Sequence, residues 1–60
     1  MTAKFEIYKD SRGEFRWRLV ASNGQAIASS GEGYISKSSA EAGIESVKKN
    51  APVAPVEEAK

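Results

Sequence analysis

Polar and apolar residues alternate along two stretches near the start of the chain, residues 4–9 and 14–21. A period of two is typical of a β-strand with one buried face. The apolar residues that share this face are Phe5 and Ile7 in the first stretch, and Phe15, Trp17, Leu19 and Ala21 in the second. The pattern therefore predicts two strands that contribute to one apolar layer.

The turn between these strands fixes how they pair. A loop of residues 11–13, with Gly13 at positive φ, places Ile7 opposite Trp17. A slip of one residue would divide the apolar residues between the two faces, so this register is strongly specified. The same register sets Phe5 opposite Leu19, Lys9 opposite Phe15, Glu6 opposite Arg18 and Tyr8 opposite Arg16.

The second turn allows two registers. A two-residue turn of Asn23 and Gly24 would pair Val20 with Ile27 and direct Ile27 outward. A three-residue loop over 22–24, with Gly24 in the left-handed region, pairs Leu19 with Ile27 inside. We favour the second register because burying an isoleucine side chain contributes about 1.5–3 kcal/mol. The third strand is then expected at about residues 25–30.

A helix is predicted after a glycine-containing connection over residues 31–35. Ser38 is the expected N-cap, and Glu41 three residues later completes the capping-box pattern. Ala40, Ile44 and Val47 follow at spacings of four and three and form one apolar stripe, which includes Gly43 beside Ile44 as a point of close approach to the sheet. Lys48 and Lys49 occupy the last turn, and Asn50 with Pro52 ends the helix.

The predicted fold class is α+β: a three-stranded antiparallel β-meander followed by one helix, in a single domain over residues 1–52. Residues 53–60 are expected to be a C-terminal tail, or a short exchanged edge strand around 56–58 that gives the order β-β-β-α-β. Pro55 restricts such a strand to an edge or to a strand start.

Composition narrows the chemistry that the chain can support. Its 60 residues contain no Cys and no His, so disulfides are excluded and a zinc site is nearly so. Domains of fewer than about 70–80 residues usually need a disulfide, a bound metal or a partner chain for stability. We therefore expect a second copy of the chain to be the stabilising partner. We predict no cofactor and no enzymatic activity, because neither a catalytic motif nor enough chain for a deep pocket is present. The fragment Gly31-x-Gly33 is too incomplete for a phosphate loop.

We expect a cytoplasmic protein with no membrane partner. The first residues lack the apolar segment of a signal peptide, and no apolar run approaches the roughly 20 residues of a membrane span. The formal net charge of +1 gives no general attraction to nucleic acid or anionic lipid.

The outer sheet face, defined here as the side that carries Lys4, Glu6, Tyr8, Arg16, Arg18 and Val20, is the candidate interaction face. Its candidate contact residues are Lys4, Tyr8, Arg16 and Arg18. Arginine beside an aromatic ring is a combination that nucleic-acid-binding sheets use. The same combination is common in protein–protein interfaces, which is a second interpretation. The third interpretation is a solvated face with cross-strand ion pairs.

Several blocks of the sequence, in order and spacing, resemble the YegP-like family of uncharacterised small prokaryotic proteins. These are Phe5-Glu6-Ile7-Tyr8-Lys9-Asp10, Gly13-Glu14-Phe15-Arg16-Trp17-Arg18-Leu19, Ala21-x-Asn23-Gly24, Gly33-Tyr34-x-Ser36-Lys37 and Gly43-Ile44-x-Ser46-Val47-Lys48-x-Asn50.

The resemblance implies a unit that occurs once per chain or twice in tandem. Single-unit members are expected to be dimers in which two β-β-β-α-β units form one continuous sheet and exchange C-terminal strands. No biochemical function is established for that family, so it supplies no catalytic residue. The expected function is therefore that of a homodimeric binding or structural module with an unknown ligand, and the alternative is nucleic-acid binding through the outer sheet face.

Overall fold

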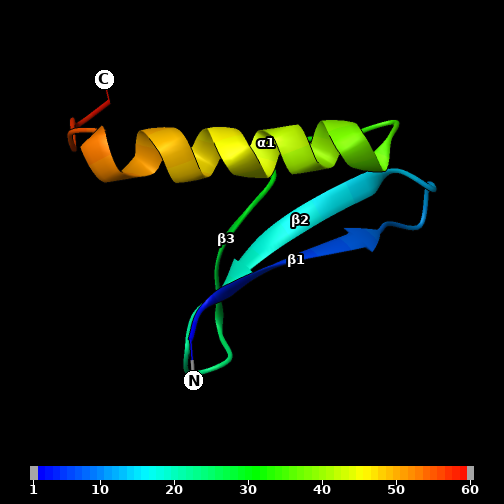
Figure 1. Ribbon diagram of the computed structural model, residues 1–60, viewed down its shortest axis with the longest axis horizontal. Coiled ribbons are helices and arrows are strands. Elements are labelled where there is room, and N and C mark those ends of the chain that lie inside the picture. Colours follow the sequence, from blue (N-terminus) through cyan, green and yellow to red (C-terminus); the bar gives the residue numbers. More distant parts are fainter. Residues whose placement is uncertain (1, 60) are drawn as a thin grey trace.

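The computed structural model describes residues 2–59 as a three-stranded antiparallel sheet with one long helix beside it (Figure 1). Its elements are β1 (Lys4–Lys9), β2 (Phe15–Val20), β3 (Ala26–Ser29), α1 (Lys37–Asn50) and the 3₁₀ turn η1 (Ala51–Val53). The predicted α+β order of meander and helix is confirmed. Met1 and Lys60, the outer ends of the predicted domain and tail, lie outside the described residues.

The first hairpin has the predicted register. Ile7 pairs with Trp17 and Phe5 with Leu19, and the outer pairs also match, Glu6 with Arg18 and Tyr8 with Arg16. Gly13 has a φ of 82°, and its backbone N–H donates to the Asp10 carbonyl at 3.0 Å. The turn and the division of apolar residues between faces thus specify the same pairing.

The second hairpin begins as predicted and then departs from the prediction. Gly24 has a φ of 91°, and Val20 pairs with Ala26, as the three-residue loop requires. A register shift follows, so that Leu19 pairs with Ala28 and Ile27 has no partner on β2. The expectation that Ile27 pairs with Leu19 in the core is wrong, since Ile27 is 63% exposed.

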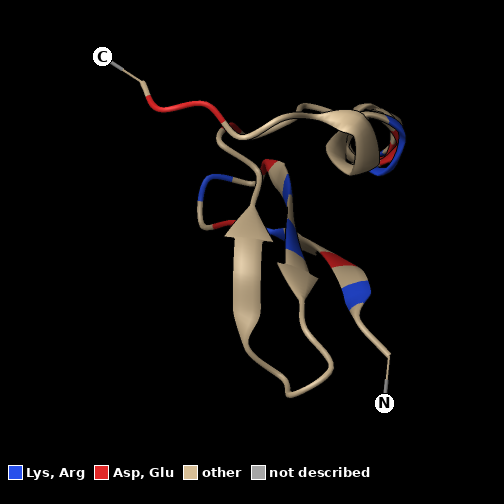
Figure 2. Cartoon of the chain, turned by 90° about the vertical axis from the view of Figure 1, so that its left-hand side faces the viewer, with Lys and Arg blue, Asp and Glu red and all other residues tan. Residues whose placement is uncertain are grey.

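The reason is the position of α1, which lies over β1 and β2 and not over β3 (Figure 2). The burial energy that favoured an inward Ile27 is therefore absent at this strand. All four residues of β3 are exposed.

The connection after β3 forms hydrogen bonds with the first residues of β2, which β3 itself does not reach. Ser30 is buried, donates its N–H to the Trp17 carbonyl at 2.9 Å and accepts the Trp17 N–H on Oγ at 3.3 Å. Tyr34 forms an isolated bridge with Phe15, in which each backbone N–H donates to the other carbonyl at 2.8 Å. This segment thus continues the hydrogen bonding of the β2 edge that β3 begins.

The helix begins earlier than the capping-box pattern predicted. Ser36 is the N-cap, with an extended backbone and an Oγ that accepts the Ser39 N–H at 3.2 Å, so the prediction of Ser38 with Glu41 is wrong. The Tyr34 bridge explains the earlier start, because it holds the backbone extended up to this point and Ser36 is the first capping residue after it.

The core between α1 and the sheet is small. Trp17, Ala40 and Ile44 are its buried apolar residues, and partly buried side chains packed against them are Phe5, Ile7, Phe15, Tyr34 and Val47. The expected close approach at Gly43 is confirmed, because a Cβ there would lie 2.6 Å from Tyr34 Oη and 3.2 Å from Trp17 Nε1. Tyr34 was not among the predicted core residues.

The helix ends at Asn50, as predicted, and the chain then continues through η1 into an exposed extended segment. Residues 54–59 form no strand in this single chain, and Val56 is fully exposed. In Figure 1 the segment leaves the end of α1 that lies away from the first hairpin turn.

Candidate functional site

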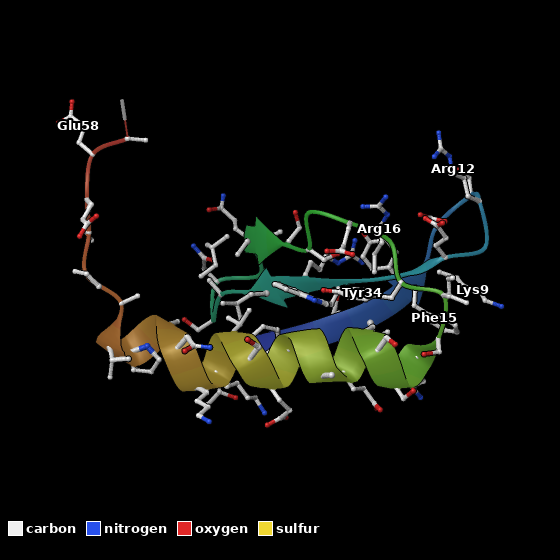
Figure 3. The ribbon with its side chains drawn as sticks, turned by 90° about the horizontal axis from the view of Figure 1, so that it is seen from above. Lys9, Arg12, Phe15, Arg16, Tyr34 and Glu58 are labelled. Atoms are coloured by element: carbon white, nitrogen blue, oxygen red, sulfur yellow. The ribbon has the colours of Figure 1, made fainter. Side chains whose placement is uncertain are left out.

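The outer sheet face arises directly from the alternation of β1 and β2. Phe5, Ile7, Phe15 and Trp17 pack toward α1, so the residues between them project from the other side of the sheet. In Figure 3 the Arg16 side chain extends away from α1. Figure 2 shows basic and acidic positions together on β1 and β2, whereas β3 carries none.

One end of the outer sheet face is organised around Glu6. Its Oε1 accepts the Arg18 Nε–H at 2.8 Å, and its Oε2 lies 3.1 Å from Lys4 Nζ. The Arg18 guanidinium also lies over the Tyr8 ring, 4.7 Å from the centroid. The hydrogen bond from Arg18, and then that from Lys4, lowers the pKa of the Glu6 carboxyl.

The other end is organised around Asp10. Its Oδ2 accepts the Arg16 Nε–H at 2.7 Å, while its Oδ1 accepts the backbone N–H groups of Arg12 and Glu14, each at 2.9 Å. The hydrogen bond from Arg16, followed by that from the Glu14 N–H, lowers the pKa of the Asp10 carboxyl. The same bond raises the pKa of Arg16.

The structure brings together all four predicted contact residues, Lys4, Tyr8, Arg16 and Arg18, and each cation among them has a carboxylate partner. Asp10 was not among the predicted contact residues, and its role as the partner of Arg16 was missed. The available signal was its place at the end of β1, one position beyond the residue opposite Phe15. There a long side chain from Arg16 can reach it diagonally across the strands.

Polar and glycine residues between β3 and α1 have structural roles. Ser36 caps α1, and its Oγ also contacts the hydroxyls of Ser38 and Ser39 at 3.2 and 2.9 Å. Gly33 lies against the Glu14 side chain in the connection before the helix. Within residues 2–59 there is no pocket and no group of three or more metal-ligating side chains. No helix in this part of the chain is long and apolar enough to cross a membrane.

Comparison with known proteins places this arrangement in a family. The family model described as a domain of unknown function, DUF1508, matches residues 10–58. A UPF0339 protein of Treponema denticola is 59% identical over 58 residues, which cover 97% of this chain and 98% of that protein.

A second relative is longer. The UPF0339 protein in the ptx operon 5′ region of Stutzerimonas stutzeri is 64% identical over 52 residues, and the match covers 87% of this chain but 46% of that protein. The chain thus spans about half the length of this relative.

A solved structure shows the same fold. The NMR solution structure of a protein from Haloferax volcanii is 57% identical and superposes with a TM-score of 0.91 over 97% of each chain. The resemblance carried by the sequence blocks is confirmed: this chain belongs to the DUF1508 family of small prokaryotic proteins, the YegP-like family, whose function is unknown.

Proposed function

We propose that the chain is a homodimeric binding or structural module, and not an enzyme, in which each copy receives the C-terminal segment of the other as an added strand. One observation carries the proposal. Residues 54–59 are exposed and belong to no sheet, while the edge strand β1 pairs within the described residues with β2 alone, so its other side is open.

The size of the core supports a second copy. Three apolar residues are buried in the part of the chain that the structure describes, and large apolar side chains remain outside the core. Ile27 is 63% exposed, Ile35 93% and Val53 79%. A chain this short buries only about 60% of the surface that its unfolded form exposes, so contacts from a partner would add substantially to its stability.

The two sheet edges differ in a way that favours β1 as the receiving strand. β3 has four residues and a register shift, and short, bulged strands resist the addition of another chain. β1 has six residues paired with β2 in an unbroken register. It begins and ends with Lys4 and Lys9, and these charges complement Glu57 and Glu58 of an incoming segment.

The position of the segment explains why it would pair with another copy. It leaves the end of α1 that lies away from the first hairpin turn and lies to the side of the three strands (Figures 1 and 3), and residues 54–59 are exposed. The Stutzerimonas relative is also consistent with the proposal, because a match over 46% of its length leaves room for a second unit in the same chain.

Sedimentation equilibrium at micromolar concentration tests the dimer. The expected mass is twice the 6.4 kDa of one chain, and a stable monomer would contradict the proposal. Deletion of residues 53–60 is expected to dissociate or unfold the dimer. A second variant, V53S/V56S, keeps the length and charge of residues 53–60 but replaces both valines, and it should also weaken the dimer. If the deleted form remains an unchanged dimer, the exchanged strand is excluded while the dimer stands.

A further inference from the structure

We infer that Arg16 and Arg18 form a phosphate clamp on the outer sheet face, which holds successive phosphates of a single-stranded nucleic acid. This inference goes beyond the proposed dimer and does not depend on it. It rests on how the two guanidinium groups are held, on their spacing along β2, and on the charge around them.

Each arginine is held by a carboxylate that accepts a hydrogen bond from its Nε atom. Arg16 donates from Nε to Asp10 at 2.7 Å, and Arg18 donates from Nε to Glu6 at 2.8 Å. Within residues 2–59, neither arginine forms a hydrogen bond through its terminal Nη groups. A guanidinium has five N–H donors, so the Nη end can still grip a phosphate with two parallel hydrogen bonds. The carboxylates therefore orient the arginines without occupying the end that would bind the ligand.

The two side chains are also limited in their motion before any ligand arrives. Their side chains are 31% and 45% exposed, and the Arg18 guanidinium lies over the Tyr8 ring. A group that is already ordered loses less conformational entropy on binding. Moreover, β2 is the central strand and is held by β1 on one side and β3 on the other.

The spacing suits a single strand of nucleic acid. Residues two apart on a β-strand project from the same face about 6.7 Å apart, which is comparable with the distance between neighbouring phosphates of an extended strand. Arg18 already covers the Tyr8 ring, so base stacking there is hindered, and we expect binding that depends little on base sequence.

The charge distribution favours an anion near Arg18. Lys4 and Arg18 share the single carboxylate of Glu6, so this end of the face keeps one positive charge, whereas Arg16 and Asp10 balance each other. Glu14 lies against Gly33 in the connecting loop. The excess is small, so the interaction is expected to be weak and sensitive to salt.

Fluorescence anisotropy with a labelled oligothymidylate at low salt tests the clamp. The double variant R16Q/R18Q is expected to lose about tenfold or more in affinity and to flatten the slope of log affinity against log salt by about 1.4 per copy. The matched variant K48Q/K49Q removes the same charge from α1 and should lose less than about threefold. The double variant R16K/R18K keeps the charge but loses the planar guanidinium groups that can donate two parallel hydrogen bonds, and it should bind several times more weakly than the native chain.

Several results would overturn the inference: no saturable binding, an equal loss in K48Q/K49Q, or native affinity in R16K/R18K. Equal competition by inorganic polyphosphate would show binding of polyanions in general and would overturn the assignment to nucleic acid. Trp17 emission and sedimentation on the same samples check fold and assembly. An intact dimer without binding contradicts the clamp alone, and a monomer that binds contradicts the dimer alone.

Discussion

Replacement of Gly43 by alanine adds a methyl group where α1 rests on Tyr34 and Trp17. The new Cβ would lie 2.6 Å from Tyr34 Oη, 3.1 Å from Tyr34 Cζ and 3.2 Å from Trp17 Nε1. These neighbours have little freedom to move, because the Tyr34 backbone is hydrogen-bonded to Phe15 in both directions and Trp17 is buried. The substitution therefore has two opposing effects on stability, a gain in helix propensity and a loss in packing.

Helix propensity favours alanine over glycine by about 0.5–1 kcal/mol in a helix interior. Forcing an extra methyl group into a packed contact costs about 1–3 kcal/mol. The contact distances indicate that the packing cost is the larger effect, so G43A should lower the free energy of unfolding by about 0.5–2 kcal/mol.

Urea unfolding followed by the emission of Trp17, the single tryptophan of the chain, measures this change at one fixed protein concentration. A42G at the neighbouring exposed position calibrates propensity in the same helix and should cost about 0.5–1 kcal/mol. In a Y34F background, which lacks the hydroxyl, G43A should cost less by at least about 0.5 kcal/mol. If G43A stabilises the native chain by the amount that A42G costs, the contact at Gly43 does not constrain the helix.

Two further predictions concern the helix cap and the charged face. S36A should lower the free energy of unfolding by about 0.5–2 kcal/mol, whereas S38A should change it by less than about 0.5 kcal/mol, and urea titration of both identifies the N-cap. Folding lowers the pKa values of Glu6 and Asp10, so the stability that they contribute is complete above the ordinary carboxyl range near about pH 4 and is lost as the pH falls through the folded values. D10N keeps Oδ1 as an acceptor for the backbone N–H groups but loses the charge facing Arg16. Urea unfolding across acidic pH should therefore show a weaker dependence in D10N than in the native chain.

The first hairpin could be predicted from sequence because two independent constraints agree on it. The loop that ends at Gly13 and the alternation around Trp17 both require the same register. The outer sheet face follows from that register at once, so the alternation of residues alone predicts which side chains project from it. The partner of Arg16 was missed although it lies diagonally across the strands, because Asp10 also accepts a hydrogen bond within the turn, and the turn alone accounts for an aspartate at this position.

The register of the second hairpin beyond the pair of Val20 and Ala26, and the start of the helix, could not be predicted, because the deciding contacts are not local. The residues of β3 are small apart from Ile27, so the pattern carries little energy to select a register. Ser36, Ser38 and Ser39 are all chemically able to cap a helix, and the long-range bridge between Tyr34 and Phe15 decides among them. The same bridge brings Tyr34 into the core, although it lies in a segment that reads as a loop.

The two proposals concern different parts of one sheet and are physically compatible. Strand addition uses the backbone groups of the β1 edge, whereas the clamp uses side chains that project from the outer sheet face of β2. In each copy α1 covers only the opposite face, so a continuous sheet formed at β1 would leave both outer faces open on the same side. The two clamps would then share one surface, and binding of a strand at one of them would raise the effective concentration of phosphates at the other. The dimer would then bind a strand more tightly than a single copy does, so pairing at the β1 edge would strengthen binding by Arg16 and Arg18.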